Sequence, residues 1–107
     1  MSIKNEIAAG WATHPGVILK KEFLEPLKIT PHRLAKELRV APPTVNQIVL
    51  QRSSITPDMA TRLARYFGTT EQFWLNLQNA FTVYRFKKEH SKELAAIQPL
   101  RVTAGSR

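Results

Sequence analysis

Apolar residues recur at helical spacing through the centre of the chain, and prolines stand where one stripe ends and the next begins. Thr30-Pro31 and Pro42-Pro43 are start signals, because proline at the first helical position fixes φ and has no N–H to leave unpaired. The first helix should therefore end near Arg39 and the second begin near Pro42, with a short turn between them. This spacing is typical of a helix-turn-helix unit. The apolar positions of the two stripes are Leu34, Ala35, Leu38, Val40, Val45, Ile48 and Val49.

Three further helices are predicted around this pair. Proline at the first position and threonine before it mark helix starts, and glycine after the last turn marks an end. The expected bounds are a start at His14-Pro15-Gly16 with an end at Pro26, a start at Thr56-Pro57 with an end at Gly68, and a start at Thr70-Glu71 with an end near His90.

The last of these helices carries an aromatic stripe, which is usually part of a core. At about 1.5 Å per residue, a helix of about twenty residues is longer than so small a domain. Its far end therefore needs a partner, and a second copy of the chain is the simplest one. We expect a homodimer. The stripe consists of Phe73, Leu77, Ala80, Phe81 and Tyr84, widened by Trp74.

Length and charge narrow the possible partners. The 107 residues suit one domain at 14–90, with an N-terminal arm at 1–13 and a C-terminal tail at 91–107. Sixteen Lys and Arg against eight Asp and Glu give a net charge of +8 and a pI near 10.3, which favours a polyanionic partner. Between Lys28 and Arg65, seven basic residues face two acidic ones, so the excess charge lies on the predicted helix pair.

The second helix of the pair presents polar groups outward, at Pro43, Thr44, Asn46 and Gln47. Asn and Gln amides pair bidentately with adenine in the major groove, so these positions suit base contacts in duplex DNA. The polar segment that follows contains Arg52 and two serines, which suit contacts to phosphates. The alternative is an ordinary pair of packed helices whose amides are merely solvated and whose connecting segment is a surface loop.

Other chemistry has little support in the sequence. With no cysteine there is no disulfide or thiolate site, which suits a reducing cytoplasm. The three histidines are dispersed, so we expect no metal site. No glycine-rich phosphate loop or nucleophile motif is present, so we expect no cofactor and no enzymatic activity. Nor is there a signal peptide or an apolar run long enough for a membrane span, and we expect a soluble cytoplasmic protein.

Several motifs are shared with a known family and extend over about residues 14–90, and the Phe-Trp-Leu-Asn-Leu-Gln run is the most specific of them. They are His14-Pro15-Gly16, Leu34-Ala35-Lys36-Glu37-Leu38, Val45-Asn46-Gln47-Ile48-Val49, Ile55-Thr56-Pro57, Ala64-Arg65-Tyr66-Phe67-Gly68-Thr69 and Phe73-Trp74-Leu75-Asn76-Leu77-Gln78. On these residues the chain resembles the HigA-type antitoxins of the XRE superfamily, relatives of phage repressor helix-turn-helix domains.

The resemblance implies an all-α, five-helix, phage-repressor-like domain with a long fifth helix. It implies a homodimer that binds a palindromic operator in its own promoter, represses that operon and neutralises a RelE-like ribonuclease toxin. The helix from Pro42 would enter the major groove, with the four outward positions named above facing the bases. Thr30, His32, Arg33 and Arg52 match phosphate-contacting positions. Two rival hypotheses remain: a stand-alone XRE-type regulator without a toxin, and a toxin-sequestering interaction protein with weak DNA binding.

The chain departs from the family pattern at two turns. Arg39 stands where the family usually has glycine, at a position that often needs a left-handed φ, which would cost about 1 kcal/mol. Leu50-Gln51-Arg52 replaces the usual Asn-Gly-Lys after the second helix. We therefore expect a changed operator preference and a differently shaped loop.

Overall fold

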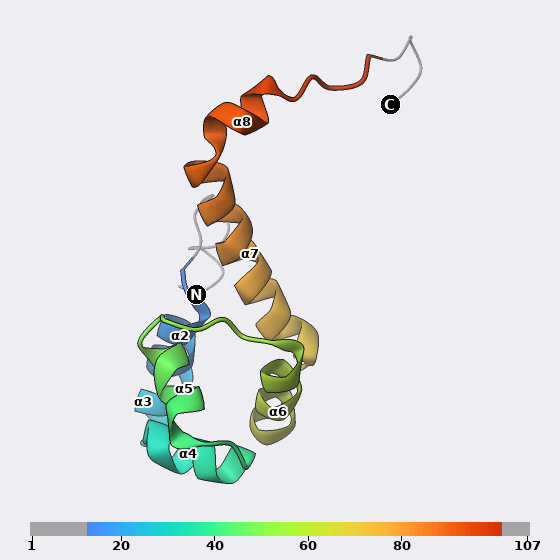
Figure 1. The fold of residues 1–107 in the computed structure, drawn as a ribbon. Helices are drawn as coiled ribbons and strands as arrows, with labels where there is room; N and C mark the ends of the chain where they lie inside the picture. Colours follow the sequence, from blue (N-terminus) through green and yellow to red (C-terminus); the bar gives the residue numbers. More distant parts are fainter. Residues whose placement is uncertain (1–12, 102–107) are drawn as a thin grey trace.

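The computed structural model describes residues 13–101, and these contain helices and connections but no strand (Figure 1). The segments between Pro15 and Leu27 form one continuous helix, so residues 13–101 contain five helices in the body of the molecule and a short sixth helix at Ser91–Ala96. The all-α fold with a long fifth helix is thus confirmed, whereas the arm predicted at 1–13 lies almost wholly outside the described residues. The segments are α2 (Pro15–Ile18), a π-helical stretch η1 (Leu19–Leu24), α3 (Glu25–Leu27), α4 (Pro31–Leu38), α5 (Pro42–Val49), α6 (Pro57–Phe67), α7 (Glu71–Glu89) and α8 (Ser91–Ala96).

Threonine caps begin three of the helices at the predicted residues. In each case the threonine hydroxyl accepts a hydrogen bond from the backbone N–H three residues later, which pairs a donor that the helix itself leaves free. The bonds run from Arg33 to Thr30 at 3.0 Å, from Met59 to Thr56 at 3.2 Å and from Phe73 to Thr70 at 3.0 Å. These starts are local properties of the sequence, which explains why their prediction is confirmed.

The predicted end of the first helix at Pro26 is wrong, because the helix continues to Leu27. The preceding stretch is wound as a π-helix, in which the Glu25 N–H bonds to the Lys20 carbonyl five residues earlier. Such a widened turn leaves room for a proline ring that would otherwise clash with the preceding turn. The chain then turns at Lys28, whose φ is 56°.

The core lies where all five helices meet. Trp74 of α7 is completely buried, and its indole N–H donates to the Thr69 hydroxyl at 2.7 Å. The Phe23 ring packs against Phe67 and Trp74 at centroid distances of 4.8 Å and 5.0 Å. The other large side chains with almost no exposure are Pro15, Leu19, Leu34, Val45, Ile48 and Leu63.

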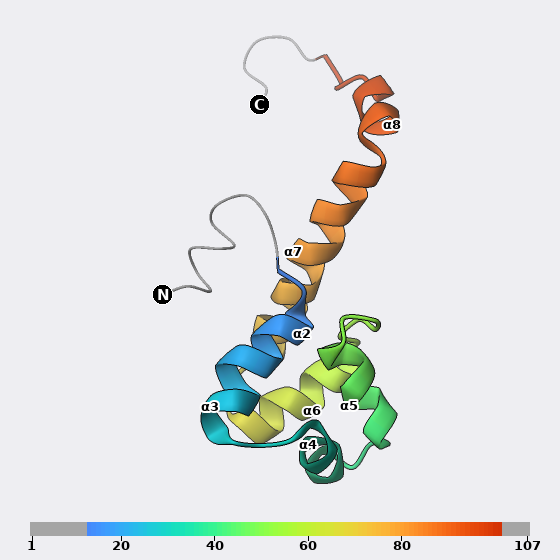
Figure 2. The same ribbon diagram turned by 90° about the vertical axis from the view of Figure 1, so that its left-hand side faces the viewer.

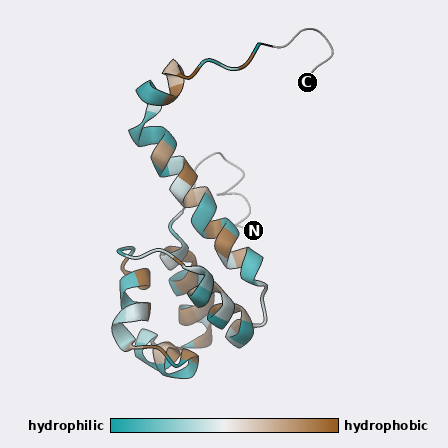
Figure 3. Cartoon of the chain, turned by 45° about the vertical axis from the view of Figure 1, so that its right-hand side comes forward, coloured by the Kyte–Doolittle hydropathy of each residue, from teal (hydrophilic) through white to brown (hydrophobic). Residues whose placement is uncertain are grey.

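The aromatic stripe of α7, expected to be part of the core, is core only in its first half. Leu77 is buried, but Phe81 and Tyr84 are half-buried, and Val83 and Phe86 are 50% and 49% exposed. Figure 2 shows the reason: α7 passes α2 and then rises away from α4, α5 and α6. Hydrophobic segments continue along α7 beyond the domain (Figure 3), and the molecule measures 56 × 25 × 24 Å.

Within residues 13–101, no helix is both long and apolar enough to cross a bilayer. The same part of the chain contains no group of three His, Cys, Asp or Glu side chains placed to hold a metal ion.

Candidate nucleic-acid interface

The turn between α4 and α5 is built around a left-handed arginine. Arg39 has φ 62°, as expected for this position. Its N–H donates to the Lys36 carbonyl at 3.1 Å, and the next N–H, of Val40, donates to the Ala35 carbonyl at 3.0 Å. This paired termination closes α4 and turns the chain sharply into α5. The helix-turn-helix geometry therefore forms without the glycine that usually occupies such a position.

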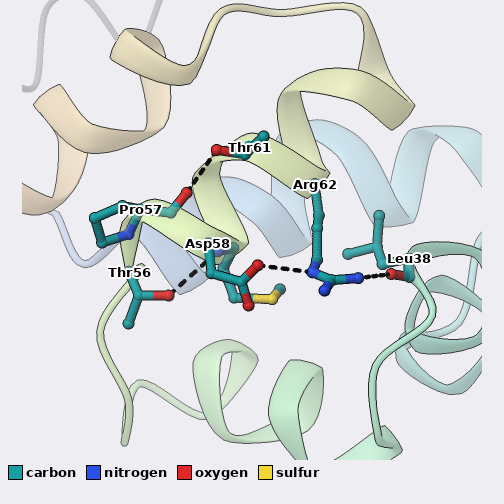
Figure 4. Close-up of polar contacts among 7 residues, drawn as sticks. Leu38, Thr56, Pro57, Asp58, Thr61 and Arg62 are labelled. Carbon is teal, nitrogen blue, oxygen red and sulfur yellow. Dashed lines mark hydrogen bonds and ion pairs between the residues drawn. The ribbon is translucent and has the colours of Figure 1, made fainter.

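Arg62 of α6 braces the same end of α4 (Figure 4). Its Nη1 donates to the carbonyl of Leu38 at 2.7 Å, and its Nε donates to Asp58 Oδ1 at 2.9 Å. A cation at a helix C-terminus pairs free carbonyls and offsets the helix dipole. Arg62, which contributes to the basic balance of this region, thus has a structural role that the sequence did not indicate.

The far end of α5 lies directly against α2. A Cβ atom built on Gly16 would lie 1.9 Å from the carbonyl oxygen of Ile48, so only glycine permits this approach. His14 caps α2, and its Nδ1 accepts the Gly16 N–H at 2.8 Å. Burial lowers the pKa of His14, which favours the neutral ring that this acceptor role requires. The sequence predicted a helix start at these residues but did not indicate that α5 packs against them.

The outward face of α5 carries the residues predicted to face bases. Pro43 and Asn46 are exposed, whereas Thr44 and Gln47 are half-buried. The side chains of Val45 and Ile48 point the other way and are buried. A hollow of about 370 Å³ separates this face from the start of α4, and it is lined by Pro31, His32, Pro42, Pro43, Asn46 and Gln47.

The residues predicted to contact phosphates fall into two places. Thr30, His32 and Arg33 are exposed together at the start of α4, beside the start of α5. The Thr30 hydroxyl is already used as the cap of α4. The guanidinium of Arg33 lies 4.0 Å from the Glu37 carboxylate in an exposed pair, which leaves it available to other partners. Arg52 lies at the opposite end of α5.

The loop after α5 repeats the turn that ends α4. Gln51 has φ 63°, its N–H donates to the Ile48 carbonyl at 2.9 Å, and the Arg52 N–H donates to the Gln47 carbonyl at 2.8 Å. Gln51 therefore adopts the left-handed conformation that glycine takes most easily. The expectation of a differently shaped loop has no support from this backbone, which closes the helix in the usual way.

Gln78 of α7 anchors the same loop from the inside. It is 7% exposed, its Oε1 accepts the Ile55 N–H at 2.7 Å, and its Nε2 donates to the Thr82 hydroxyl at 3.0 Å. No role was predicted for it. The available signal was a glutamine one helical turn after Trp74 and next to Leu77, on the buried side of an amphipathic helix.

Comparisons with known proteins agree with this geometry. A family model described as helix-turn-helix matches residues 20–74. A solved structure of the Pseudomonas aeruginosa antitoxin HigA with the higBA promoter is 44% identical, with a TM-score of 0.81, and covers 83% of this chain and 98% of that one. Virulence-associated protein I of Dichelobacter nodosus is 42% identical over 94% of this chain and 90% of its own length. Antitoxin HigA-1 of Vibrio cholerae is 35% identical over 82% of this chain and 83% of its own length.

Proposed function

The chain belongs to the HigA-type group of XRE helix-turn-helix proteins, and from this premise we propose that it is a sequence-specific DNA-binding antitoxin that represses its own toxin-antitoxin operon. The observation that supports this most directly is the exposed polar face of α5 beside the hollow at the start of α4. The 44% identical HigA, with the higBA promoter in its structure, supports DNA as the partner of that face.

In this proposal α5 lies in the major groove of the operator. Pro43, Thr44, Asn46 and Gln47 face the bases, and the two amides pair with adenine N6 and N7. Each good bidentate pair contributes about 1 to 3 kcal/mol of discrimination between bases. The buried side of α5 holds the helix at a fixed angle, so base selection depends on the outward side chains alone.

Phosphate contacts position the protein without selecting sequence. Thr30, His32 and Arg33 contact one wall of the groove from the start of α4, and Arg52 contacts the backbone from the loop after α5. Because the net charge is +8, binding releases counterions and weakens steeply as salt rises.

Two copies bind together, at half-sites about 34 Å apart on a palindromic operator. The support within the chain is the second half of α7, where Val83 is half exposed on a helix that extends beyond its own domain. A second copy would remove this apolar surface from water.

The cognate partner is a RelE-like ribonuclease toxin, which the protein neutralises by binding it. Support for this comes from the likeness to antitoxins. Inspection of the neighbouring reading frame is the first test, and we expect an adjacent gene for a small basic protein that copurifies with this chain. A chain without such a neighbour would be a stand-alone regulator.

A band-shift titration tests DNA binding. The protein is titrated against its own upstream DNA and against a scrambled duplex of equal length, at two salt concentrations. We expect tighter binding to the upstream DNA at both. Equal affinity for the two duplexes would contradict a repressor and favour an interaction protein that sequesters a toxin.

A further inference from the structure

A second cavity, of about 240 Å³, lies at the end of α5 opposite the hollow beside α4. Three separate segments of the chain line it: the residue that caps α2, the loop after α5 and the second half of α7. The lining residues used below are His14, Arg52, Ser53, Ser54, Arg85 and Glu89. The residues predicted to contact DNA lie on α4, on α5 and in the segments directly before α4 and after α5.

The walls of this cavity are held by hydrogen bonds to buried groups. Gln78 fixes the Ile55 end of the loop at 2.7 Å, and the Gln47 carbonyl accepts the N–H groups of Arg52 and Ser53 at 2.8 Å and 3.2 Å. On the floor, the His14 ring packs edge-on against Phe81 at 4.9 Å. The loop is therefore tied to α7 through Gln78.

The donors that line the cavity suit an anion with several oxygens. Arg52 from the loop and Arg85 from α7 both line the cavity, together with Ser53 and Ser54. Within residues 13–101, the Arg52 side chain forms no ion pair or hydrogen bond. Arginine guanidinium groups and serine hydroxyls are among the groups that proteins use to bind phosphate.

One carboxylate also lines the cavity and competes for Arg85. The Arg85 Nε lies 3.6 Å from Glu89 Oε2, and both side chains are more than half exposed. An exposed pair of this kind is weak, and a guanidinium has five N–H donors, so Arg85 keeps donors for a second anion. Its planar group lies over the Phe81 ring, 5.5 Å from the centroid, which orients it.

The position of the cavity relative to α5 points to the DNA backbone. With eight residues, α5 is about 12 Å long, and the major groove is about 12 Å wide. In Figure 1, α5 begins beside α4 and ends at the connection that leads to α6. The start of α4 and this cavity thus stand at the two ends of the helix, where the two phosphate walls of a groove that contains α5 would pass.

We infer that the cavity binds a phosphate of the DNA backbone, with Arg85 of α7 as a phosphate-binding residue beside Arg52. The inference rests on the proposed function and extends it, because it brings the long helix into contact with DNA. A ligand bound to another part of α7 would then contact the same helix that contacts the operator.

Salt titration of single variants tests the inference. Affinity is measured for upstream and scrambled duplexes across a salt series, with wild-type protein, Arg85→Ala and Lys87→Ala. Lys87 is an exposed cation of the same helix that does not line the cavity, so it controls for net charge. We expect Arg85→Ala to weaken both duplexes by about five- to tenfold and to lower the slope of log affinity against log salt by about 0.9. Lys87→Ala should leave the slope unchanged.

A variant that is expected to bind DNA more tightly excludes damage to the fold as the explanation for the weaker binding of Arg85→Ala. Glu89→Gln removes the competing carboxylate, so it should tighten both duplexes by roughly two- to threefold. Thermal melting of each variant checks that the helix is intact. A wild-type slope in Arg85→Ala, or no gain in Glu89→Gln, would overturn the inference.

Free phosphate is the other possible source of the same chemistry. Amide NMR signals of Ser53 and Ser54 are followed during titration of the free protein with inorganic phosphate. Shifts there together with unchanged DNA binding by Arg85→Ala would identify a free-anion site and overturn the backbone contact. Failure of the proposed function differs visibly from both outcomes, since wild-type protein itself would not prefer its upstream DNA.

Discussion

The two faces of α5 differ in how closely they are packed. The inward face is fixed by close contact: Ile48 is buried, its carbonyl lies against Gly16, and the loop that follows is tied to Gln78. The outward face has no such restraint, with Asn46 exposed beside an open hollow. Stability and base selection therefore depend on different sides of one helix, so substitutions on each side should have separable effects.

The largest effect is expected from Gly16→Ala. Its new Cβ would lie 1.9 Å from a backbone oxygen that cannot rotate away, so α2 and α5 must separate. We expect a loss of about 3 kcal/mol or more in the free energy of unfolding, measured by denaturant titration. Gly68→Ala is the matched control, because its Cβ would meet nothing within 4 Å and only the φ of 76° is unfavourable. It should cost about 1 kcal/mol. Equal losses in the two variants would disprove the steric contact.

Removal of the loop anchor should have the next largest effect. Gln78→Ala leaves the buried Ile55 N–H without its acceptor, which costs about 1 to 3 kcal/mol of unfolding free energy. Gln72→Ala in the same helix removes an exposed amide bonded to Asn76, and should change stability by less than about 0.5 kcal/mol. A thermal melt of both variants makes the comparison, and similar melting temperatures would show that Gln78 does not anchor the loop.

On the outward face, Gln47→Ala should change selection and leave folding almost intact. We expect the preference for the operator over scrambled DNA to fall by about 1 to 3 kcal/mol. Arg33→Ala should instead weaken every duplex about equally. Band shifts with both duplexes distinguish the two patterns. A uniform loss of affinity in both variants would mean that the assignment of the groove-facing side is wrong.

A smaller gain in stability is expected from glycine at the left-handed turns. Arg39→Gly and Gln51→Gly relieve an unfavourable φ at 62° and 63° but increase the entropy of the unfolded chain. The net result should be a stabilisation of about 0.5 to 1 kcal/mol for each variant, seen in denaturant titration. Arg33→Gly, inside the first turn of α4, should instead destabilise the protein. A loss of stability in both turn variants would show that these side chains contribute contacts that outweigh the strain.

The smallest effect concerns His14 and pH. Burial lowers its pKa from the ordinary 6.5, and the nearby Arg85 adds to this, while a hydrogen bond with the Ser53 backbone opposes it. The unfolded chain therefore binds more protons than the folded one just below pH 6.5. The free energy of unfolding should fall as pH drops from about 6.5, until the folded ring is protonated as well. His14→Asn, which keeps a capping side chain, should show a flatter profile over this range, and an identical profile would exclude His14 as the cause.

The helix starts were predictable because their signals are local. Thr30, Thr56 and Thr70 cap helices within three residues of themselves, and nothing distant is needed to pair those N–H groups. The exposure of Pro43 and Asn46 also follows from helical period once the buried stripe is known. Their role as base contacts stays a prediction that Gln47→Ala and its band shifts address.

The wrong expectations have a common physical origin. Pro26 was treated as a helix end because a regular α-helix has no room for it, and the π turn before it is a choice of backbone winding that residue types do not reveal. Phe81 and Tyr84 were expected in the core because periodicity shows which side of a helix is apolar, and it does not show how far along the helix a neighbouring element extends.

The sequence by itself determines the local features of this chain, because each depends on a few neighbouring residues. These features are the residues where helices begin, the apolar stripe of each helix and the positions of the turns. The position of α5 against the rest of the domain was decided only by the tertiary structure. It depends on Gly16, Arg62 and Gln78, which contact the end of α5, the end of α4 and the loop before α6 from more than twenty positions away in the sequence. Such contacts exist only after distant segments have packed. The effect of a glycine or of a buried amide depends on which distant atom lies against it, and the sequence does not give that atom.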